Sequence, residues 1–251
     1  DVTDLKKLVH EIMAERGTVA NPAVATVYAH LEGMMGWTEF DMKLRDDFIY
    51  FTGVCHETDT CFTFMNVLRQ QESVEGFPGE ALPSTAFYFT KQGVTDWASL
   101  LSYGDMQETG VRTSDVRNRN RELSHYLMEN AGQELVACLF QREDTLQEAA
   151  AVLSLSVSDV TEAERMLRSL INTVSAEERG KAPLITFCYT ANKAYPVYRL
   201  PQTTLFTQLT GFAEPTSHTY ATFYEGRLLL APDENSLSRY IRQLDKGELL
   251  N

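Results

Sequence analysis

The sequence predicts an α+β fold in which the hairpins of an antiparallel sheet are covered by helices on one face, and in which this architecture is internally duplicated. Three observations lead to this prediction. Segments of alternating apolar and polar residues occur in adjacent pairs joined by short polar turns, as in β-hairpins. Segments with the apolar period of a helix separate these pairs, without the regular strand–helix alternation of a parallel sheet. Finally, the two ends of the chain share one order of elements.

The first 80 residues are expected to contain helices and one hairpin. Apolar residues with helical spacing, stopped by glycine, predict the helices, and alternation on both sides of a polar turn predicts the hairpin. The expected elements are helices over 1–17 and 24–35, strands over 40–44 and 48–54, and a short helix from 62. Residues 70–83, which contain Gly76-Phe-Pro-Gly79, predict a long loop.

The remainder of the chain has a denser pattern. The predicted strands are 85–90, 134–140, 149–157, 184–190, 195–200, 218–224 and 227–231. The predicted helices are 95–104, 114–132, 159–171, 205–211 and 236–245. Thr95 and Ser114 are expected to cap helices, and Gly104 to end one. Within 149–157 the alternation of apolar residues with serine predicts one buried and one mostly wet face.

An ordered similarity between the two ends of the chain is the basis for the predicted duplication. Residues 1–9 match 159–167, Gly36-Trp37 matches Gly211-Phe212, 40–51 match 220–231, and 64–71 match 237–244. We interpret residues 1–80 as the C-terminal part of a first unit and 81–251 as a second, fuller unit. The alternative is chance similarity between amphipathic helices, because helix starts resemble one another.

The composition is that of a globular protein. Of 251 residues, 43% are hydrophobic and 23% charged, which excludes disorder and coiled coil. The net charge of −13 argues against a nucleic-acid partner, because phosphate recognition needs clustered Lys and Arg. No apolar run approaches the roughly 20 residues of a membrane span, so no transmembrane segment is expected.

Several segments resemble a family of uncharacterised Bacteroidetes envelope proteins. They are Leu82-Pro-Ser-Thr-Ala-Phe-Tyr-Phe89, Trp97-Ala-Ser-Leu-Leu101, Phe223-Tyr-Glu-Gly-Arg-Leu-Leu-Leu230, Ser236-Leu-Ser-Arg-Tyr-Ile241 and the hairpin Gly36-Trp-Thr-Glu-Phe-Asp-Met-Lys-Leu-Arg-Asp-Asp-Phe48. The resemblance implies an exported protein of the periplasm or outer membrane, often a lipoprotein, with no established activity and no functional residues to transfer. Because the chain starts at Asp1 without Met, we expect its targeting segment to lie further upstream.

The densest cluster of reactive side chains is Cys55-His-Glu-Thr-Asp-Thr-Cys61. Its side chains Cys55, His56, Glu57, Asp59 and Cys61 are of the types that bind zinc, although the second cysteine pair typical of structural zinc sites is missing. The two cysteines can instead be unremarkable free thiols, or form a disulfide in an oxidising compartment. If the chain is an enzyme, a hydrolase-like site is expected around His56, Glu57 and Asp59.

Arg117, Arg121 and His125 form the clearest basic feature of this acidic chain. Because they are spaced four residues apart, they lie along one face of the helix predicted over 114–132. Such a stripe can hold an anion through bidentate guanidinium contacts. The alternative is a solvated face that Asp115 and Glu122 balance through weak surface pairing.

The function expected from the sequence is a non-catalytic binding or structural module. The motifs of zinc proteases, serine hydrolases, dinucleotide-binding enzymes and P-loop proteins are absent from the sequence. The aromatic residues Trp37, Trp97, Tyr189, Tyr195 and Tyr198 can stack on sugars, but their patterns favour core positions. We therefore expect a protein or glycan partner and no cofactor, with an enzyme of undescribed class as the alternative.

Overall fold

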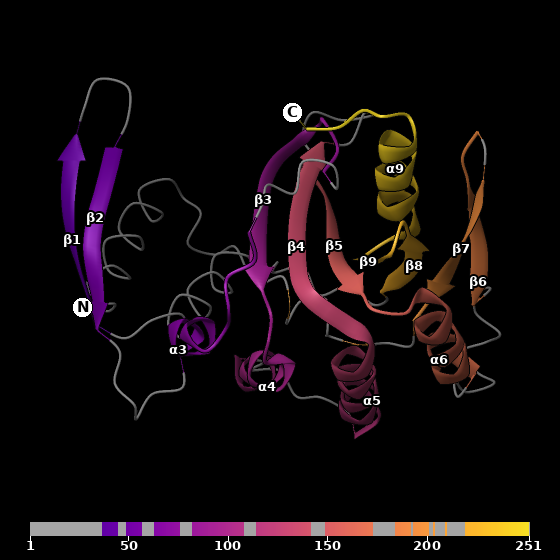
Figure 1. The fold of residues 1–251 in the computed structure, drawn as a ribbon, viewed down its shortest axis with the longest axis horizontal. Helices are drawn as coiled ribbons and strands as arrows, with labels where there is room; N and C mark the ends of the chain where they lie inside the picture. Colours follow the sequence, from indigo (N-terminus) through magenta and orange to yellow (C-terminus); the bar gives the residue numbers. More distant parts are fainter. Residues whose placement is uncertain are drawn as a thin grey trace, which may run out of the picture.

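The computed structural model describes residues 37–44, 49–56, 63–75, 82–107, 114–141, 149–172, 184–191, 193–200, 203, 209 and 219–250. The elements in chain order are β1 (Trp37–Leu44), β2 (Ile49–His56), α3 (Phe64–Arg69), β3 (Ala86–Gly93), α4 (Trp97–Gln107), α5 (Ser114–Asn130), β4 (Ala131–Gln141), β5 (Ala149–Val157), α6 (Val160–Asn172), β6 (Ile185–Tyr189), β7 (Ala194–Arg199), β8 (Tyr220–Tyr224), β9 (Arg227–Ala231) and α9 (Glu234–Asp245) (Figure 1). The helices expected over 1–17 and 24–35, and most of the one over 205–211, lie outside these residues.

A seven-stranded antiparallel sheet is the centre of the fold. Its strand order is β3-β4-β5-β9-β8-β7-β6, so β3 and β6 are its edges, and β1 and β2 form a separate two-stranded sheet (Figure 1). The two residues between β8 and β9, Glu225 and Gly226, both have positive φ, 44° and 78°, as a type I′ hairpin turn requires. The predicted α+β class with antiparallel hairpins is confirmed.

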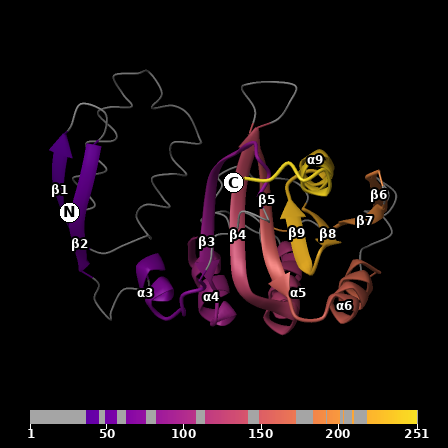
Figure 2. The ribbon, with the colours of Figure 1, turned by 45° about the horizontal axis from the view of Figure 1, so that its top comes forward.

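Helices cover both faces of this sheet, so the prediction of helices on one face is wrong. On one face α4, α5 and α6 pack over side chains such as Leu153 and Leu155 of β5. On the other face α9 packs over Val152 of the same strand, and Figure 2 shows α9 separated from the other three helices by the strands. Ser154, expected on a wet face, is buried on this covered face, and its Oγ is satisfied by a hydrogen bond of 2.5 Å from Arg227 Nε.

Capping explains where two helices begin. Asp96, rather than Thr95, caps α4, because its Oδ1 accepts the N–H of Ser99 at 3.1 Å. Asp233 caps α9 in the same way, so that helix begins at Glu234, two residues earlier than predicted. Gly104 does not end α4, which continues to Gln107, since a glycine inside a helix costs only about 1 kcal/mol.

The two units expected from the sequence each contain a hairpin followed by a helix within the described residues. The hairpin β1–β2 forms its own sheet and is followed by α3, whereas β8–β9 lies inside the large sheet and is followed by α9. Val67 of α3 is fully buried in the same core as α4 and α5, so α3 packs with elements that follow residue 81. The duplication itself stays a prediction.

No helix among the described residues is long and apolar enough to span a membrane.

Candidate functional site

An open groove of about 320 Å³ lies along the contact between α5 and α6. It is lined by Arg121, Glu122, His125, Tyr126, Glu129, Met166 and Leu170. The two helices lie side by side because each presents an apolar stripe to the sheet, with Leu123 and Leu127 from α5 and Leu167 and Ile171 from α6 all buried. The groove is therefore formed where these two stripes meet at the surface.

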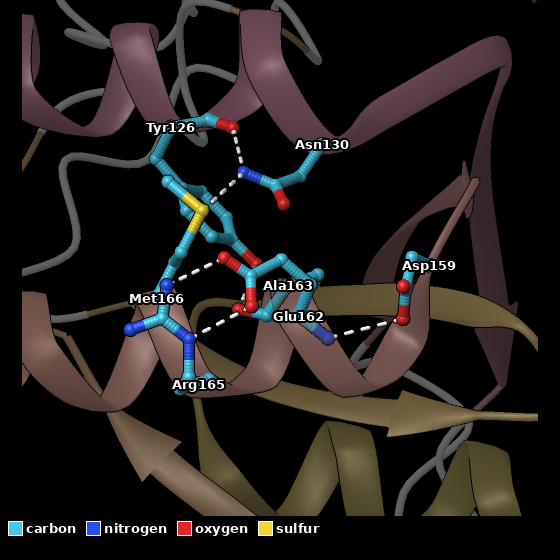
Figure 3. A network of polar contacts seen from close by, with 7 residues as sticks. All are labelled: Tyr126, Asn130, Asp159, Glu162, Ala163, Arg165 and Met166. Atoms are coloured by element: carbon cyan, nitrogen blue, oxygen red, sulfur yellow. Dashed lines mark hydrogen bonds and ion pairs between the residues drawn. The ribbon is translucent and has the colours of Figure 1, made fainter.

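Hydrogen bonds between α5 and α6 fix the floor of the groove. Tyr126 Oη donates to the carbonyl of Ala163 at 3.1 Å, and Figure 3 shows the ring of Tyr126 reaching from α5 towards α6. Asn130 Nδ2 donates to the carbonyl of Tyr126 at 2.9 Å and lies 3.5 Å from Met166 Sδ. Burial raises the pKa of Tyr126 well above its usual range, so its hydroxyl stays a neutral donor. The helices are thus held together at the position of Met166.

The outer surface of α6 is ordered by ion pairs. Asp159 accepts the N–H of Glu162 at 3.1 Å and caps the helix, which begins at Val160. Arg165 forms a two-pronged contact with Glu162, from Nε at 2.7 Å and from a terminal nitrogen at 2.5 Å (Figure 3). Neither Arg165 nor Glu162 belongs to the lining of the groove.

A second set of contacts anchors α6 to the sheet. Tyr198 of β7 donates from its hydroxyl to Glu164, and Arg168 pairs with the same carboxylate at 2.8 Å while lying 5.3 Å from the centre of the Tyr198 ring. Burial acts to raise the pKa of Glu164, but the hydrogen bonds from Tyr198 and Arg168 outweigh it and hold that pKa below its usual range. The backbone on which Met166 sits is therefore fixed from both sides.

The rim of the groove carries both charges. Arg121 and His125, two residues of the predicted basic stripe, line it, and the third, Arg117, is exposed on the same helix outside the lining. Glu122 and Glu129 lie on the same rim, and His125 Nδ1 is 3.4 Å from Glu129 Oε1. The spacing argument thus placed these cations on one helix, and the acidic neighbours balance them. Anion binding stays a prediction.

The chemistry of this groove is that of recognition by packing. Its floor consists of Met166, Leu170 and the ring of Tyr126, whose relative exposure is only 4%. Its rim offers a guanidinium, an imidazole and two carboxylates. An apolar floor with a polar rim matches the anatomy of protein–protein contact sites, where one anchor side chain fills a pocket and polar groups surround it.

The cysteine-containing cluster is only partly described by the structure. Cys55 is half-buried and His56 exposed at the end of β2, while Glu57, Asp59 and Cys61 lie outside the described residues. Within the described parts of the chain, no three His, Cys, Asp or Glu side chains are placed to hold a metal ion together. The zinc site, the disulfide and the hydrolase-like site therefore stay predictions.

Most of the described aromatic residues named from the sequence are buried, with one exception. Trp97, Tyr195 and Tyr198 are buried as predicted, and the Trp37 side chain lies outside the described set. Tyr189 is 65% exposed, so its predicted core position is wrong. The reason is that β6 is an edge strand, and none of the described helices packs over this face of it.

A polar cluster on the α9 face of the sheet was missed by sequence reasoning. Glu134 of β4 accepts from Arg227 at 2.7 Å and from Lys91 at 3.2 Å, and Arg227 also donates to Ser154. Burial acts to raise the pKa of Glu134, but the contacts with Arg227 and Lys91 lower it overall. These side chains come from four strands, and only the strand order brings them together.

Comparison with known proteins identifies no relative: no protein-family model, curated protein or solved structure matches the chain. The resemblance to Bacteroidetes envelope proteins therefore stays a prediction.

Proposed function

We propose that this protein is a non-catalytic binding module that recognises a protein partner through the α5–α6 groove. The observation that supports this most directly is the groove itself, with an apolar floor around Met166 and Leu170 and a rim of mixed charge. A volume of about 320 Å³ is at the lower end of the range for ligand pockets and suits one or two apolar side chains. The rim is suited to the polar groups that flank such an anchor.

A protein partner is favoured over a glycan by the character of the floor. Sugars stack on exposed aromatic faces, whereas the ring of Tyr126 in this groove is almost completely buried and its hydroxyl holds α6. Met166 is a flexible, polarisable side chain of the type found at adaptable protein-binding surfaces. On the basis of the resemblance described above, we propose that the protein is exported to the periplasm or outer membrane of a bacterium and that the module acts there.

The proposal is tested by site-specific photo-crosslinking in an extract of the source organism. A benzoylphenylalanine at position 170 is expected to give one discrete adduct with a partner protein, because this position lines the groove. The matched control carries the same group at Met128, which is 45% exposed on α5 outside the groove lining. Adducts of equal yield at both positions would show that the groove has no special affinity.

Substitution of the floor provides the second part of this test. Met166→Lys places an ammonium group in the groove and is expected to reduce crosslinking from position 170 by about tenfold, as loss of an anchor contact does at protein interfaces. Met128→Lys is the control and should leave the yield unchanged. Thermal unfolding of both variants, followed by circular dichroism, separates loss of binding from loss of folding.

A further inference from the structure

The edge strand β6 exposes a row of apolar side chains. Ile185, Phe187 and Tyr189 have relative exposures of 39%, 51% and 65%, and the rings of Phe187 and Tyr189 lie 6.3 Å apart. The alternate side chains face α9, where Thr186 donates to Glu234 and Cys188 is buried. One face of β6 is thus packed against a helix, and the apolar side chains of the other face are exposed. The strand itself lies at the end of the sheet (Figure 1).

The backbone of β6 is also available on its outer side. The N–H of Arg199 donates to the carbonyl of Leu184, and that of Thr190 donates to the carbonyl of Lys193. Because hydrogen-bonded pairs alternate along an antiparallel ladder, the even-numbered residues of β6 bond to β7 and the odd-numbered residues direct their N–H and C=O groups outward. Arg242 Nε lies 3.3 Å from the carbonyl of Tyr189, which agrees with this direction. On this outer side, Ile185 and Phe187 have no hydrogen bond to any described residue.

The opposite edge of the sheet, β3, has features that prevent pairing with a further strand, and β6 lacks them. In β3 the register shifts between Ala86 and Tyr88, and such a bulge interrupts strand pairing. Lys91 lies on β3 and pairs with Glu134. At Gly93 the carbonyl oxygen of Glu72 lies only 2.0 Å from where a Cβ would be, so another segment of the chain covers that end. By contrast, residues 182–192 contain no charged side chain. Their one proline, Pro183, precedes β6, so the strand itself contains none.

We propose that β6 pairs with β6 of a second copy of this chain, antiparallel and centred on Phe187. In this register Phe187 lies opposite Phe187 of the second copy, and Ile185 opposite its Tyr189, so each exposed apolar side chain meets another. The outward N–H and C=O groups of these three residues then form up to six hydrogen bonds across the two-fold axis, two of which replace the contact of Arg242 Nε with the Tyr189 carbonyl in each copy. A closed, isologous contact of this kind ends at two copies.

Charge and area both bear on the choice of a second copy. The chain carries a net charge of −13, so two copies repel over most of their surface, and β6 is an uncharged place at which they can meet. Nearby, Lys193 pairs with Glu225 at 3.2 Å, and Arg242 adds an exposed cation. From typical side-chain areas, the three residues expose roughly 300 Å² per copy, which is less than a standard interface and predicts a weak dimer.

Sedimentation equilibrium of the whole chain at increasing concentration tests the proposal. The wild-type protein is expected to shift from monomer to dimer, with a Kd on the order of 100 μM for so small an interface. Phe187→Lys introduces the charge that natural edge strands use against pairing and should weaken the dimer at least about tenfold. The matched control, Phe87→Lys, changes the same residue type at an exposed position of β3 and should leave the equilibrium unchanged.

Crosslinking establishes the register. In a chain in which Cys55 and Cys61 are replaced by Ser, Phe187→Cys should form an intermolecular disulfide on mild oxidation, because the hydrogen-bonded pair at the axis brings two Cα atoms to about 5.5 Å. Phe87→Cys in the same background should not form this disulfide.

A wild-type protein that stays monomeric at every soluble concentration overturns the proposal. The edge of β6 is then either exposed to solvent or paired with a strand of another protein. A dimer that Phe187→Lys leaves intact also overturns the proposal.

Discussion

The hydroxyl of Tyr126 illustrates how a single buried polar group positions the candidate site. Its hydrogen bond to the carbonyl of Ala163 crosses from α5 to α6 directly below the groove. The ring is packed in the core, so the hydroxyl has exchanged water for this one acceptor. The distance between the two helices at Met166 therefore depends on the hydrogen bond between Tyr126 and Ala163, which is internal to the protein.

Tyr126→Phe is expected to lower the free energy of unfolding by about 1 kcal/mol, the usual net contribution of one hydrogen bond, because the ring itself is retained. Urea denaturation followed by circular dichroism measures the change. Tyr189→Phe removes a hydroxyl from an exposed ring and serves as the control, with no measurable change expected. Equal stabilities of Tyr126→Phe and the wild-type protein would contradict a structural role for the bond.

Individual site residues were predicted from the sequence only where local spacing was sufficient. The four-residue spacing of Arg121 and His125 placed both on one face of α5, and both line the groove. Met166 and Leu170 come from a different helix, and nothing in their own sequence neighbourhood distinguishes a groove floor from core. Glu134 and Arg227 are nearly a hundred residues apart, so their ion pair depends on strand order, which local patterns do not contain.

At the scale of elements, alternation and capping predicted which segments are strands and helices, and packing decided where they lie. The hairpins β4–β5, β6–β7 and β8–β9 form as the sequence predicts, because adjacent strands with a short turn pair locally. The position of β6 at an edge follows from long-range pairing, and a row of alternating apolar residues looks the same in an inner strand. The exposure of Phe187 was missed for this reason.

The N-terminus of α9 makes a testable contribution to the covering of the second sheet face. Asp233 Oδ1 accepts the N–H of Ser236 at 2.8 Å, and Oδ2 accepts its hydroxyl at 2.6 Å. Asp233→Ala removes this cap and is expected to cost about 1 kcal/mol of unfolding free energy. Asn235→Ala, at an exposed position of the same turn, should cost much less.

Hydrogen exchange distinguishes a local effect of Asp233→Ala from a global one. Because the cap satisfies backbone N–H groups of the first turn, the amides of residues 234–237 should lose protection before those of β5 and β9. Uniform loss of protection over the whole sheet would instead show that α9 and the sheet open as one unit. Unchanged stability would show that the cap contributes nothing.

At the scale of the whole molecule, the fold separates the two surfaces for which we propose different partners. The α5–α6 groove lies on one side of the large sheet, and the uncovered side chains of β6 lie at its edge. Tyr198 of β7 is paired with Glu164 of α6, so the strand next to β6 and the helix that forms one wall of the groove are joined by a direct contact.

The pH dependence of stability tests the ion pairs that hold these parts together. Glu134 and Glu164 both have a pKa below the usual range in the folded protein. A carboxyl group with a lowered folded pKa binds more protons in the unfolded chain, so its stabilisation is complete above the unfolded pKa of about 4.3 and is lost as the pH falls through the folded value. The free energy of unfolding should therefore change little between pH 7 and 5.5 on account of these two groups and decrease below about pH 4.5.

Glu134→Gln and Glu164→Gln should each lower the free energy of unfolding at pH 7 by about 1.5–3 kcal/mol, the range for hydrogen bonds to charged groups. Each should also make the decrease below pH 4.5 less steep. Glu122→Gln, at an exposed position of the groove rim, is the control and should keep the wild-type slope. Urea denaturation at closely spaced pH values, repeated in 0.5 M salt, separates these buried contacts from the general repulsion of an acidic chain, because salt screens the latter far more strongly. An acid limb that both Gln variants share unchanged with the wild-type protein would assign the acid sensitivity to other groups.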